Sequence, residues 1–207
     1  MEPFTVVRGA AAPLMRPDVD TDILAPAHGG RGDPALSAFA PIRYLPDGQE
    51  DPSFVLNQGP FRGAPILLAG HNFGCGSSRE NAVWCLQALG IRCVIAPSFG
   101  DIFFGNCFQN GLLPIVLDAK TVDRLAEEAA GGEPMVVDLT ASTLTSPGGT
   151  TIPFAVNPTR REQLLDGVDD LTLGPRRLDL VRAFEATDRQ RRPWVYDIPG
   201  IDEGATP

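Results

Sequence analysis

The strongest constraint on the fold comes from three short apolar runs, separated by two stretches of helical periodicity, in the middle of the chain. Continuous apolar runs of this length are typical of strands buried on both faces. The expected strands cover residues 65–69, 91–96 and 112–117, and the expected helices cover residues 77–89 and 98–109. Because strands joined by helices pair in parallel with right-handed crossovers, this region predicts a βαβαβ core.

The rest of the chain predicts additions around that core. Three short segments with a turn sequence SPGG between the last two predict antiparallel strands at 135–139, 141–145 and 151–156. Further expected elements are a strand within residues 1–9 and helices near 121–130, 158–166 and 175–187. The chain therefore predicts an α/β fold in which a mixed sheet has a parallel core and antiparallel additions.

Proline, glycine and aspartate are frequent in residues 17–53, which have little periodicity. This composition predicts a long, partly ordered surface region, and loops of such length usually carry function or are disordered. A chain of 207 residues suits one domain. We expect a single domain over residues 1–197 and a flexible tail over residues 198–207.

Composition excludes several classes of function. The formal net charge is −9, so the chain is not expected to bind nucleic acid through its general field. Any site for an anion must instead create positive potential locally. The sequence has no run of about 18 apolar residues and no recognisable signal peptide at its start, so we expect no membrane span and a cytoplasmic location.

The cysteines do not form a pattern for binding a metal. Four cysteines stand at positions 75, 85, 93 and 107, with no CxxC pair, and the two histidines are His28 and His71. This is a poor set of ligands for zinc, and disulfides are not expected in a cytoplasmic chain of this size. We expect no metal site, and Cys85 and Cys93 are expected to be small core residues.

The stretch GHNFGCGSSRE, residues 70–80, follows an expected strand and precedes an expected helix. Ser77 and Glu80 match a capping box, and glycines at 70, 74 and 76 allow sharp turns and close approach to a ligand. A helix N-terminus at the carboxyl edge of a parallel sheet attracts anions, and the fork of Arg79 binds carboxylates. The stretch predicts a carboxylate site; the alternative is a simple helix cap beside a solvated arginine.

Other ligand-binding motifs do not fit. The stretch lacks the third glycine of GxGxxG, the chain has no Gly-Lys-Ser/Thr of a P-loop, and no GxSxG elbow is present. Asp18, Asp20 and Asp22 match the first half of a calcium loop. Ile23 and Gly29 then stand where that loop requires glycine and glutamate, so calcium is rejected.

Four segments together resemble a known family: DVDTDILAP (18–26), NFGCGSSREN (72–81), IAPSFGDIFFGN (95–106) and NGLLPI (110–115). They resemble the small subunits of 3-isopropylmalate dehydratase, which are similar to the swivelling fourth domain of aconitase. A weaker match over residues 164–173 extends the resemblance over nearly the whole chain, roughly residues 3–197.

The resemblance implies a swivelling β/β/α domain and a heterodimer with a large subunit. It implies a [4Fe-4S] cluster on three cysteines of that large subunit, and no cofactor in this chain. The implied enzyme is a hydro-lyase, active only with the large subunit, that interconverts 2-isopropylmalate and 3-isopropylmalate in leucine biosynthesis. Water is removed and added back through an alkene, and the partner's iron acts as a Lewis acid on the leaving hydroxyl.

The resemblance also implies roles for single residues. Ser77 matches the serine that acts as the base in aconitase, and Arg79 matches the arginine that binds a substrate carboxylate. Ser78 and Gly76 are expected to line the substrate site. Thr21 and Asp22, with Asp20, match a segment at the cleft and are expected beside the substrate rather than in the chemical step.

Departures from the family pattern leave alternatives open. Residues 27–30 read Ala-His-Gly-Gly where the family commonly continues Lys-Gln-Phe-Leu, Asn81 replaces a usual histidine, and Gly100 replaces a usual alanine. One alternative is a related hydro-lyase acting on another 2-alkylmalate or a homoaconitate-type acid. Another is a non-catalytic member that retains the fold and binds a partner or a small acid; a free-standing nucleotide-binding domain is disfavoured because no phosphate fingerprint occurs.

Overall fold

The computed structural model describes residues 1–26, 32–168 and 178–196. The chain divides into two compact units, Met1–Val168 (unit 1) and Asp169–Pro207 (unit 2). Within its described residues, unit 2 contains the helix α9 (Leu178–Arg191) and the 3-10 turn η3 (Pro193–Val195). The predicted boundary between residues 197 and 198 lies outside the described residues and stays a prediction.

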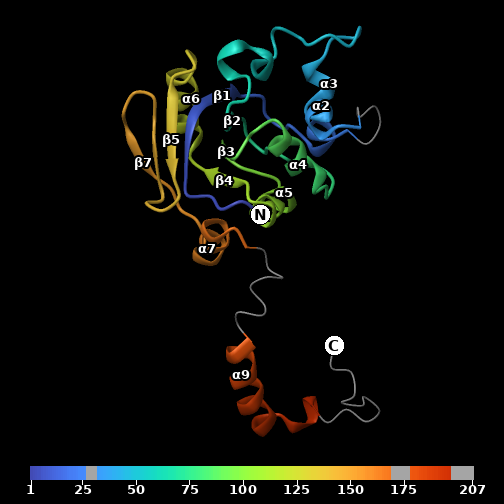
Figure 1. Cartoon of the computed structure of the whole chain (residues 1–207), viewed down its shortest axis with the longest axis vertical. Helices are drawn as coiled ribbons and strands as arrows, with labels where there is room; N and C mark the ends of the chain where they lie inside the picture. The colour runs from blue at the N-terminus through green and yellow to red at the C-terminus, as the bar shows by residue number, and fades with distance from the viewer. Residues whose placement is uncertain (27–31, 169–177, 197–207) are drawn as a thin grey trace. The chain divides into compact units, whose positions relative to one another are not determined.

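Unit 1 is built on a seven-stranded sheet with the order β4-β3-β2-β1-β5-β6-β7 (Figure 1). The four strands from β4 to β1 pair in parallel, and β5, β6 and β7 continue the sheet in antiparallel. The strands are β1 (Val6–Leu14), β2 (Ile66–Ala69), β3 (Cys93–Ala96), β4 (Leu113–Val116), β5 (Pro134–Asp138), β6 (Thr143–Thr145) and β7 (Thr151–Pro153). The predicted parallel core with antiparallel additions is confirmed.

The helices of unit 1 connect and cover these strands. They are α1 (Thr21–Leu24), α2 (Pro34–Ser37), α3 (Ala40–Arg43), α4 (Asn81–Ala88), α5 (Asp101–Asn110), α6 (Ala119–Glu128) and α7 (Pro158–Asp166), with 3-10 turns η1 (Val55–Asn57) and η2 (Gly59–Phe61). Helix α5 ends at Gly111, whose φ of 82° is the left-handed conformation that favours glycine after a helix. None of the described helices is long and apolar enough to span a membrane.

The parallel strands separate two hydrophobic cores. Side chains alternate along a strand, so Ile66 and Leu68 of β2 enter one core, while Leu67 and Ala69 enter the other. Helix α6 joins the first core through Val122 and Leu125; helix α4 joins the second through residues such as Leu86. Burial on both faces explains why the strands read as unbroken apolar runs.

The region between β1 and β2 differs from the expected surface loop. Its described residues form α1, α2 and α3, and Val19, Leu24 and Phe39 are fully buried in the core. The Arg43 side chain is also buried, where its Nε donates to Asn57 Oδ1 at 3.1 Å and its Nη1 donates to the Ala35 carbonyl at 2.7 Å. The few apolar residues of this region are irregularly spaced. The sequence therefore shows no helical or strand period, although the region packs into the core.

Candidate functional site

The glycine-rich stretch leaves the carboxyl end of β2 and crosses the edge of the sheet before α4 begins. At Gly70 an added Cβ would lie 2.4 Å from the Arg16 carbonyl oxygen. At Gly74, which has φ of 73°, it would lie 2.2 Å from the ring of Phe103. These two glycines therefore serve contacts within the protein, and only Gly76 of the three is exposed.

Two distant sequence motifs meet along this stretch. The Asp18 amide donates to the His71 carbonyl at 2.9 Å, the Gly74 amide donates to the Val19 carbonyl at 2.7 Å, and the Thr21 amide donates to the Cys75 carbonyl at 2.9 Å. The two segments thus run side by side in parallel. The structure brings together the two motifs that were expected at one cleft.

The short helix α1 is hydrogen-bonded to the glycine-rich loop. Asp20 caps it by accepting a hydrogen bond from the Ile23 amide at 2.8 Å. Thr21 is only 1% exposed, and its hydroxyl donates to the Ser77 carbonyl at 3.0 Å. Through Thr21, α1 fixes the backbone at the position of the predicted catalytic serine.

The capping box predicted at Ser77 is wrong. Helix α4 begins at Asn81, its N-cap is Glu80, and no side-chain capping bond is formed. The Ser77 carbonyl is bound to Thr21 and Gly76 has φ of 93°, so the chain crosses α1 before it becomes helical. The Glu80 carboxylate instead accepts from Asn110 Nδ2 at 2.8 Å, which links α4 to α5. A helix dipole acts mainly within the first turn, so α4 favours an anion at Ser77 less than the sequence implied.

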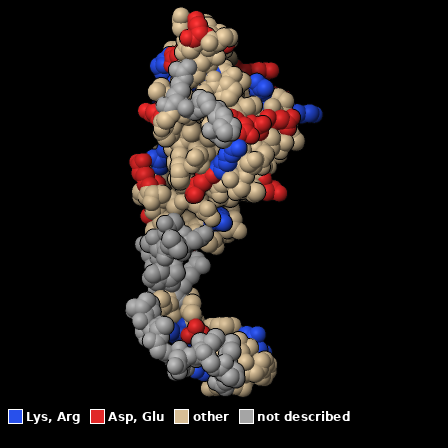
Figure 2. Space-filling view, turned by 90° about the vertical axis from the view of Figure 1, so that its right-hand side faces the viewer, with Lys and Arg blue, Asp and Glu red and all other residues tan. Residues whose placement is uncertain are grey.

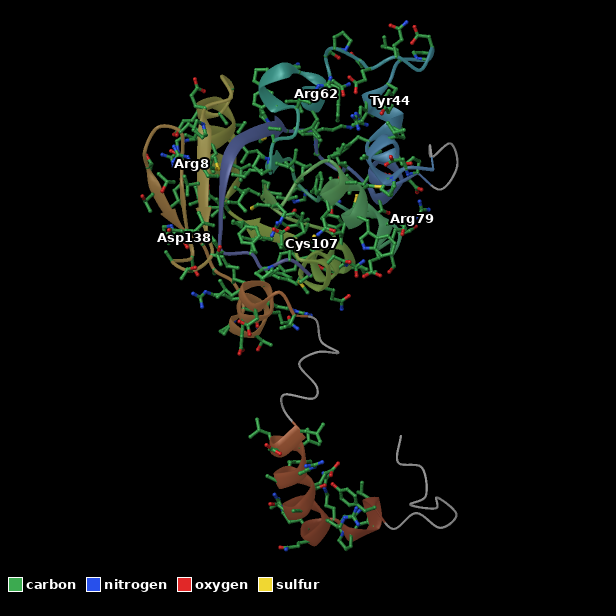
Figure 3. All side chains as sticks on the ribbon, viewed as in Figure 1. Arg8, Tyr44, Arg62, Arg79, Cys107 and Asp138 are labelled. Carbon is green, nitrogen blue, oxygen red and sulfur yellow. The ribbon has the colours of Figure 1, made fainter. Side chains whose placement is uncertain are left out.

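Ser77 and Ser78 are exposed and precede Arg79, which is partly buried. Nη1 of Arg79 donates to Asp22 Oδ1 and also to the Ala25 carbonyl, the latter at 3.3 Å. Figure 3 shows Arg79 at the edge of unit 1 where α2 and α4 come together. Predicted residues Ser77, Ser78, Arg79, Thr21 and Asp22 therefore lie at one place in the fold.

Two cavities flank this loop. The larger cavity, of about 610 Å³, includes Arg79 in its wall. It is lined by Ala25, Pro26, Gly32, Pro34, Ser37, Arg79, Asn81, Trp84 and Cys85. The smaller, of about 280 Å³, is lined by Gly74, Cys75, Gly76, Gly100, Asp101 and Ile102. Arg79 therefore lines the larger cavity, and Gly74, Cys75 and Gly76 line the smaller one.

The smaller cavity lies at the N-terminus of α5, which sequence reasoning did not assign to the site. Gly100 is the N-cap of this helix, and no side-chain capping bond is formed. A Cβ at Gly100 would lie 2.6 Å from the Gly74 carbonyl oxygen, so glycine permits close contact between the two loops. The family segment IAPSFGDIFFGN (95–106), with Gly100 in place of the usual alanine, was the signal in the sequence that could have found this contact.

The pKa values of the cysteine thiols are raised, which disfavours the thiolate, the form that acts as nucleophile and metal ligand. Burial raises the pKa of Cys75, and the carboxylates of Asp20 and Asp18 raise it further. Burial also raises the pKa of Cys85, Cys93 and Cys107, and the predicted core positions of Cys85 and Cys93 are confirmed. Within the described ranges, no group of three or more His, Cys, Asp or Glu side chains is placed to hold a metal ion. The described residues therefore contain no set of ligands that fits a [4Fe-4S] cluster.

Charges of both signs lie close together on the face of the molecule drawn in Figure 2. Arg79 forms an ion pair with Asp22 of α1, so the positive charge of the site has a carboxylate beside it. The arrangement suits a small carboxylic acid better than a long polyanion.

Comparisons with known proteins identify the family of the chain. The family model described as the aconitase C-terminal domain matches residues 39–120. The 3-isopropylmalate dehydratase small subunit of Rhodospirillum centenum is 50% identical over 201 residues, covering 94% of this chain and 99% of that protein. The corresponding subunit of Cupriavidus necator is 46% identical over 205 residues, covering 95% and 99%. The crystal structure of 3-isopropylmalate dehydratase from Methanocaldococcus jannaschii aligns with a TM-score of 0.63 at 30% identity, covering 86% of this chain and 99% of that chain.

Proposed function

The chain belongs to the family of 3-isopropylmalate dehydratase small subunits, and we propose that it interconverts 2-isopropylmalate and 3-isopropylmalate together with a large subunit. The observation that carries the proposal is the placement of an exposed Ser77 two residues from Arg79, on a loop held by α1 and flanked by cavities. The reaction is a step of leucine biosynthesis, and we place the enzyme in the cytoplasm.

The chemistry requires a base and a holder for a carboxylate. Dehydration removes a proton from one carbon next to a carboxylate and a hydroxyl from the neighbouring carbon, which leaves an alkene. Rehydration adds the proton and the hydroxyl to these two carbons in exchanged positions. Ser77 is proposed to take and return this proton, since its hydroxyl is exposed on the loop. A serine hydroxyl is a very weak acid, and a nearby guanidinium favours its ionised form. Arg79 binds the substrate carboxylate through its planar fork, and Ser78 and Gly76 line the site.

The large subunit completes the site. From the family resemblance we infer that it carries a [4Fe-4S] cluster, which would polarise the departing hydroxyl. Ser77 is open to solvent in the chain alone, and acid–base chemistry next to a carboxylate works best when water is excluded. The isolated chain is therefore expected to be inactive.

Reconstitution tests this function. The chain is co-purified with the large subunit of the same organism, and turnover is followed by the ultraviolet absorbance of the alkene. Because residues 27–30 depart from the family pattern, the panel contains 2-isopropylmalate, other 2-alkylmalates and homocitrate. Activity strongest on 2-isopropylmalate supports the proposal; activity confined to another acid redirects it to that substrate, and inactivity on all of them favours a non-catalytic member.

The role of Ser77 is tested in the same heteromer. Ser77→Ala is expected to lower kcat by about 10²–10⁴-fold, the usual effect of losing a general base, with little change in KM. Ser53→Ala removes another exposed serine hydroxyl, one bonded to Asp51, and is expected to leave kcat unchanged. Near-normal turnover of Ser77→Ala would refute the assigned role.

A further inference from the structure

The ion pair between Asp22 and Arg79 joins two parts of the chain that are 57 residues apart. Its meaning depends on the proposed function, in which Arg79 binds a substrate carboxylate. The Asp22 side chain is 61% exposed and that of Arg79 is 27% exposed. Exposed ion pairs contribute little to folding. The pair therefore needs an explanation other than stability.

The contact occupies one nitrogen of the guanidinium. Nη1 donates to both Asp22 Oδ1 and the Ala25 carbonyl. Among the described residues, Nε and Nη2 of Arg79 have no hydrogen-bond acceptor. These two nitrogens form one edge of the planar fork, the kind of edge that grips a carboxylate with two parallel hydrogen bonds.

Asp22 is carried on an anchored element. Helix α1 is capped by Asp20, is bonded to the glycine-rich loop through the Thr21 amide, and inserts Leu24 fully into the core. The Ala25 carbonyl, the second acceptor of Nη1, follows directly after this helix. Both acceptors of Nη1 are therefore fixed to the same support, and they restrict how the long Arg79 side chain rotates.

We propose that Asp22 is a positioning residue, which holds Nη1 of Arg79 so that the Nε–Nη2 edge faces the substrate carboxylate. The guanidinium then lies between two carboxylates, one from the protein and one from the substrate. Pre-orienting the fork reduces the side-chain freedom that substrate binding would otherwise have to freeze. In this arrangement Asp22 acts through Arg79 and makes no contact with the substrate.

The first test uses substitutions of Asp22 in the active heteromer. Asp22→Ala is expected to raise KM for the preferred substrate by about tenfold, with kcat changing much less, because the fork loses a charged hydrogen-bond partner. Asp22→Asn keeps Oδ1 as an acceptor and is expected to recover part of the loss. Asp47→Ala, which removes an exposed acid bonded to the Gln49 amide at 3.0 Å, serves as the matched control and is expected to keep the wild-type KM.

A double-mutant cycle distinguishes positioning from direct contact. If Asp22 acts through Arg79, the combined Asp22→Ala and Arg79→Ala variant has the same kcat/KM as Arg79→Ala alone. Losses that multiply mean that Asp22 contacts the substrate itself, and a lower KM in Asp22→Ala means that it competes with the substrate for Arg79. Either outcome overturns the proposal. Thermal melting of each variant verifies folding, and an inactive wild-type heteromer would instead count against the proposed function.

Discussion

At the scale of single residues, the glycines at positions 70, 74 and 76 have different roles although the sequence presents them alike. Gly70 and Gly74 allow close contact with the Arg16 carbonyl and the Phe103 ring, respectively. A Cβ added at Gly76 would make only ordinary van der Waals contacts, with Thr21 Oγ1 as the nearest atom at 3.4 Å. Two of the three glycines therefore shape the support of the site, and one lies at its exposed surface.

This distinction predicts unequal costs for alanine at two glycines of similar backbone conformation. Gly63 has φ of 74° and no neighbour within 4 Å, so Gly63→Ala is expected to cost only backbone strain, about 1 kcal/mol. Gly74 has φ of 73°, and Gly74→Ala adds a clash with Phe103 to the backbone strain. This clash is expected to cost about 1–3 kcal/mol more than Gly63→Ala. Urea denaturation of both variants measures the difference. Equal destabilisation by the two substitutions would show that the Phe103 side chain moves aside at no cost in stability.

At the scale of elements, the segment from α2 to η2 is held together by a small charged cluster. The Glu50 carboxylate accepts hydrogen bonds from Arg43 at 3.3 Å and from Arg62 at 2.6 Å. Arg43 is also bonded to Ala35 in α2 and to Asn57 in η1. Because α2 forms one wall of the larger cavity, this cluster links the packing of the segment to the shape of the site.

The cluster makes a predictable contribution to pH-dependent stability. The hydrogen bond from Arg62 is the main cause that lowers the pKa of Glu50, and the charges of Arg62 and Arg43 add to it. A lowered folded-state pKa stabilises the protein above the unfolded-state pKa, and the effect is lost as pH falls through the folded-state pKa. Glu50→Gln is therefore expected to lower Tm at pH 7, and its difference from wild type should shrink below about pH 4.

Thermal melting between pH 3 and about pH 7 tests this expectation. Glu127→Gln, at an exposed position in α6, is the control for removing one negative charge from the surface. A difference between Glu50→Gln and wild type that stays constant over the whole range would contradict the role of the carboxylate.

At the scale of the whole molecule, unit 1 contains both hydrophobic cores. Their buried residues all lie at or before Leu164, and the chain of unit 1 ends at Val168. In unit 2 the described helix α9 leaves Leu180 72% exposed and Phe184 62% exposed. The packing that defines the seven-stranded sheet therefore lies within unit 1.

A chain that ends at Val168 is accordingly expected to fold on its own. Its circular dichroism should show the same cooperative thermal transition, with Tm within a few degrees of the full chain, because no core residue is removed. A control truncation after Asp138 removes Leu144, Phe154 and Leu164 from the first core, the one that contains Ile66 and Leu68, and should abolish cooperativity. A non-cooperative transition in the 1–168 chain would contradict the division into units.

Much of this architecture could be predicted from local pattern. The apolar runs predicted the parallel strands because burial on both faces leaves a continuous signature, and the hairpin strands followed from the SPGG turn. The motifs around Thr21 and Ser77 predicted that two distant segments would meet, and the structure places them side by side. The prediction that α4 starts at Ser77 was wrong, because the Thr21–Ser77 hydrogen bond outweighs a local capping preference.

The sequence by itself determined the strand and helix content of the core and the family, since these depend on periodicity and on motifs of neighbouring residues. The roles of Ser77 and Arg79, which come from the same motifs, stay predictions. Only the tertiary structure decided that Val19, Leu24 and Phe39 are buried, that α5 rather than α4 starts beside the smaller cavity, and that Asp22 holds Arg79. Each of these depends on where segments far apart in the chain meet, and no local pattern records the hydrogen bonds and packing formed at such a meeting.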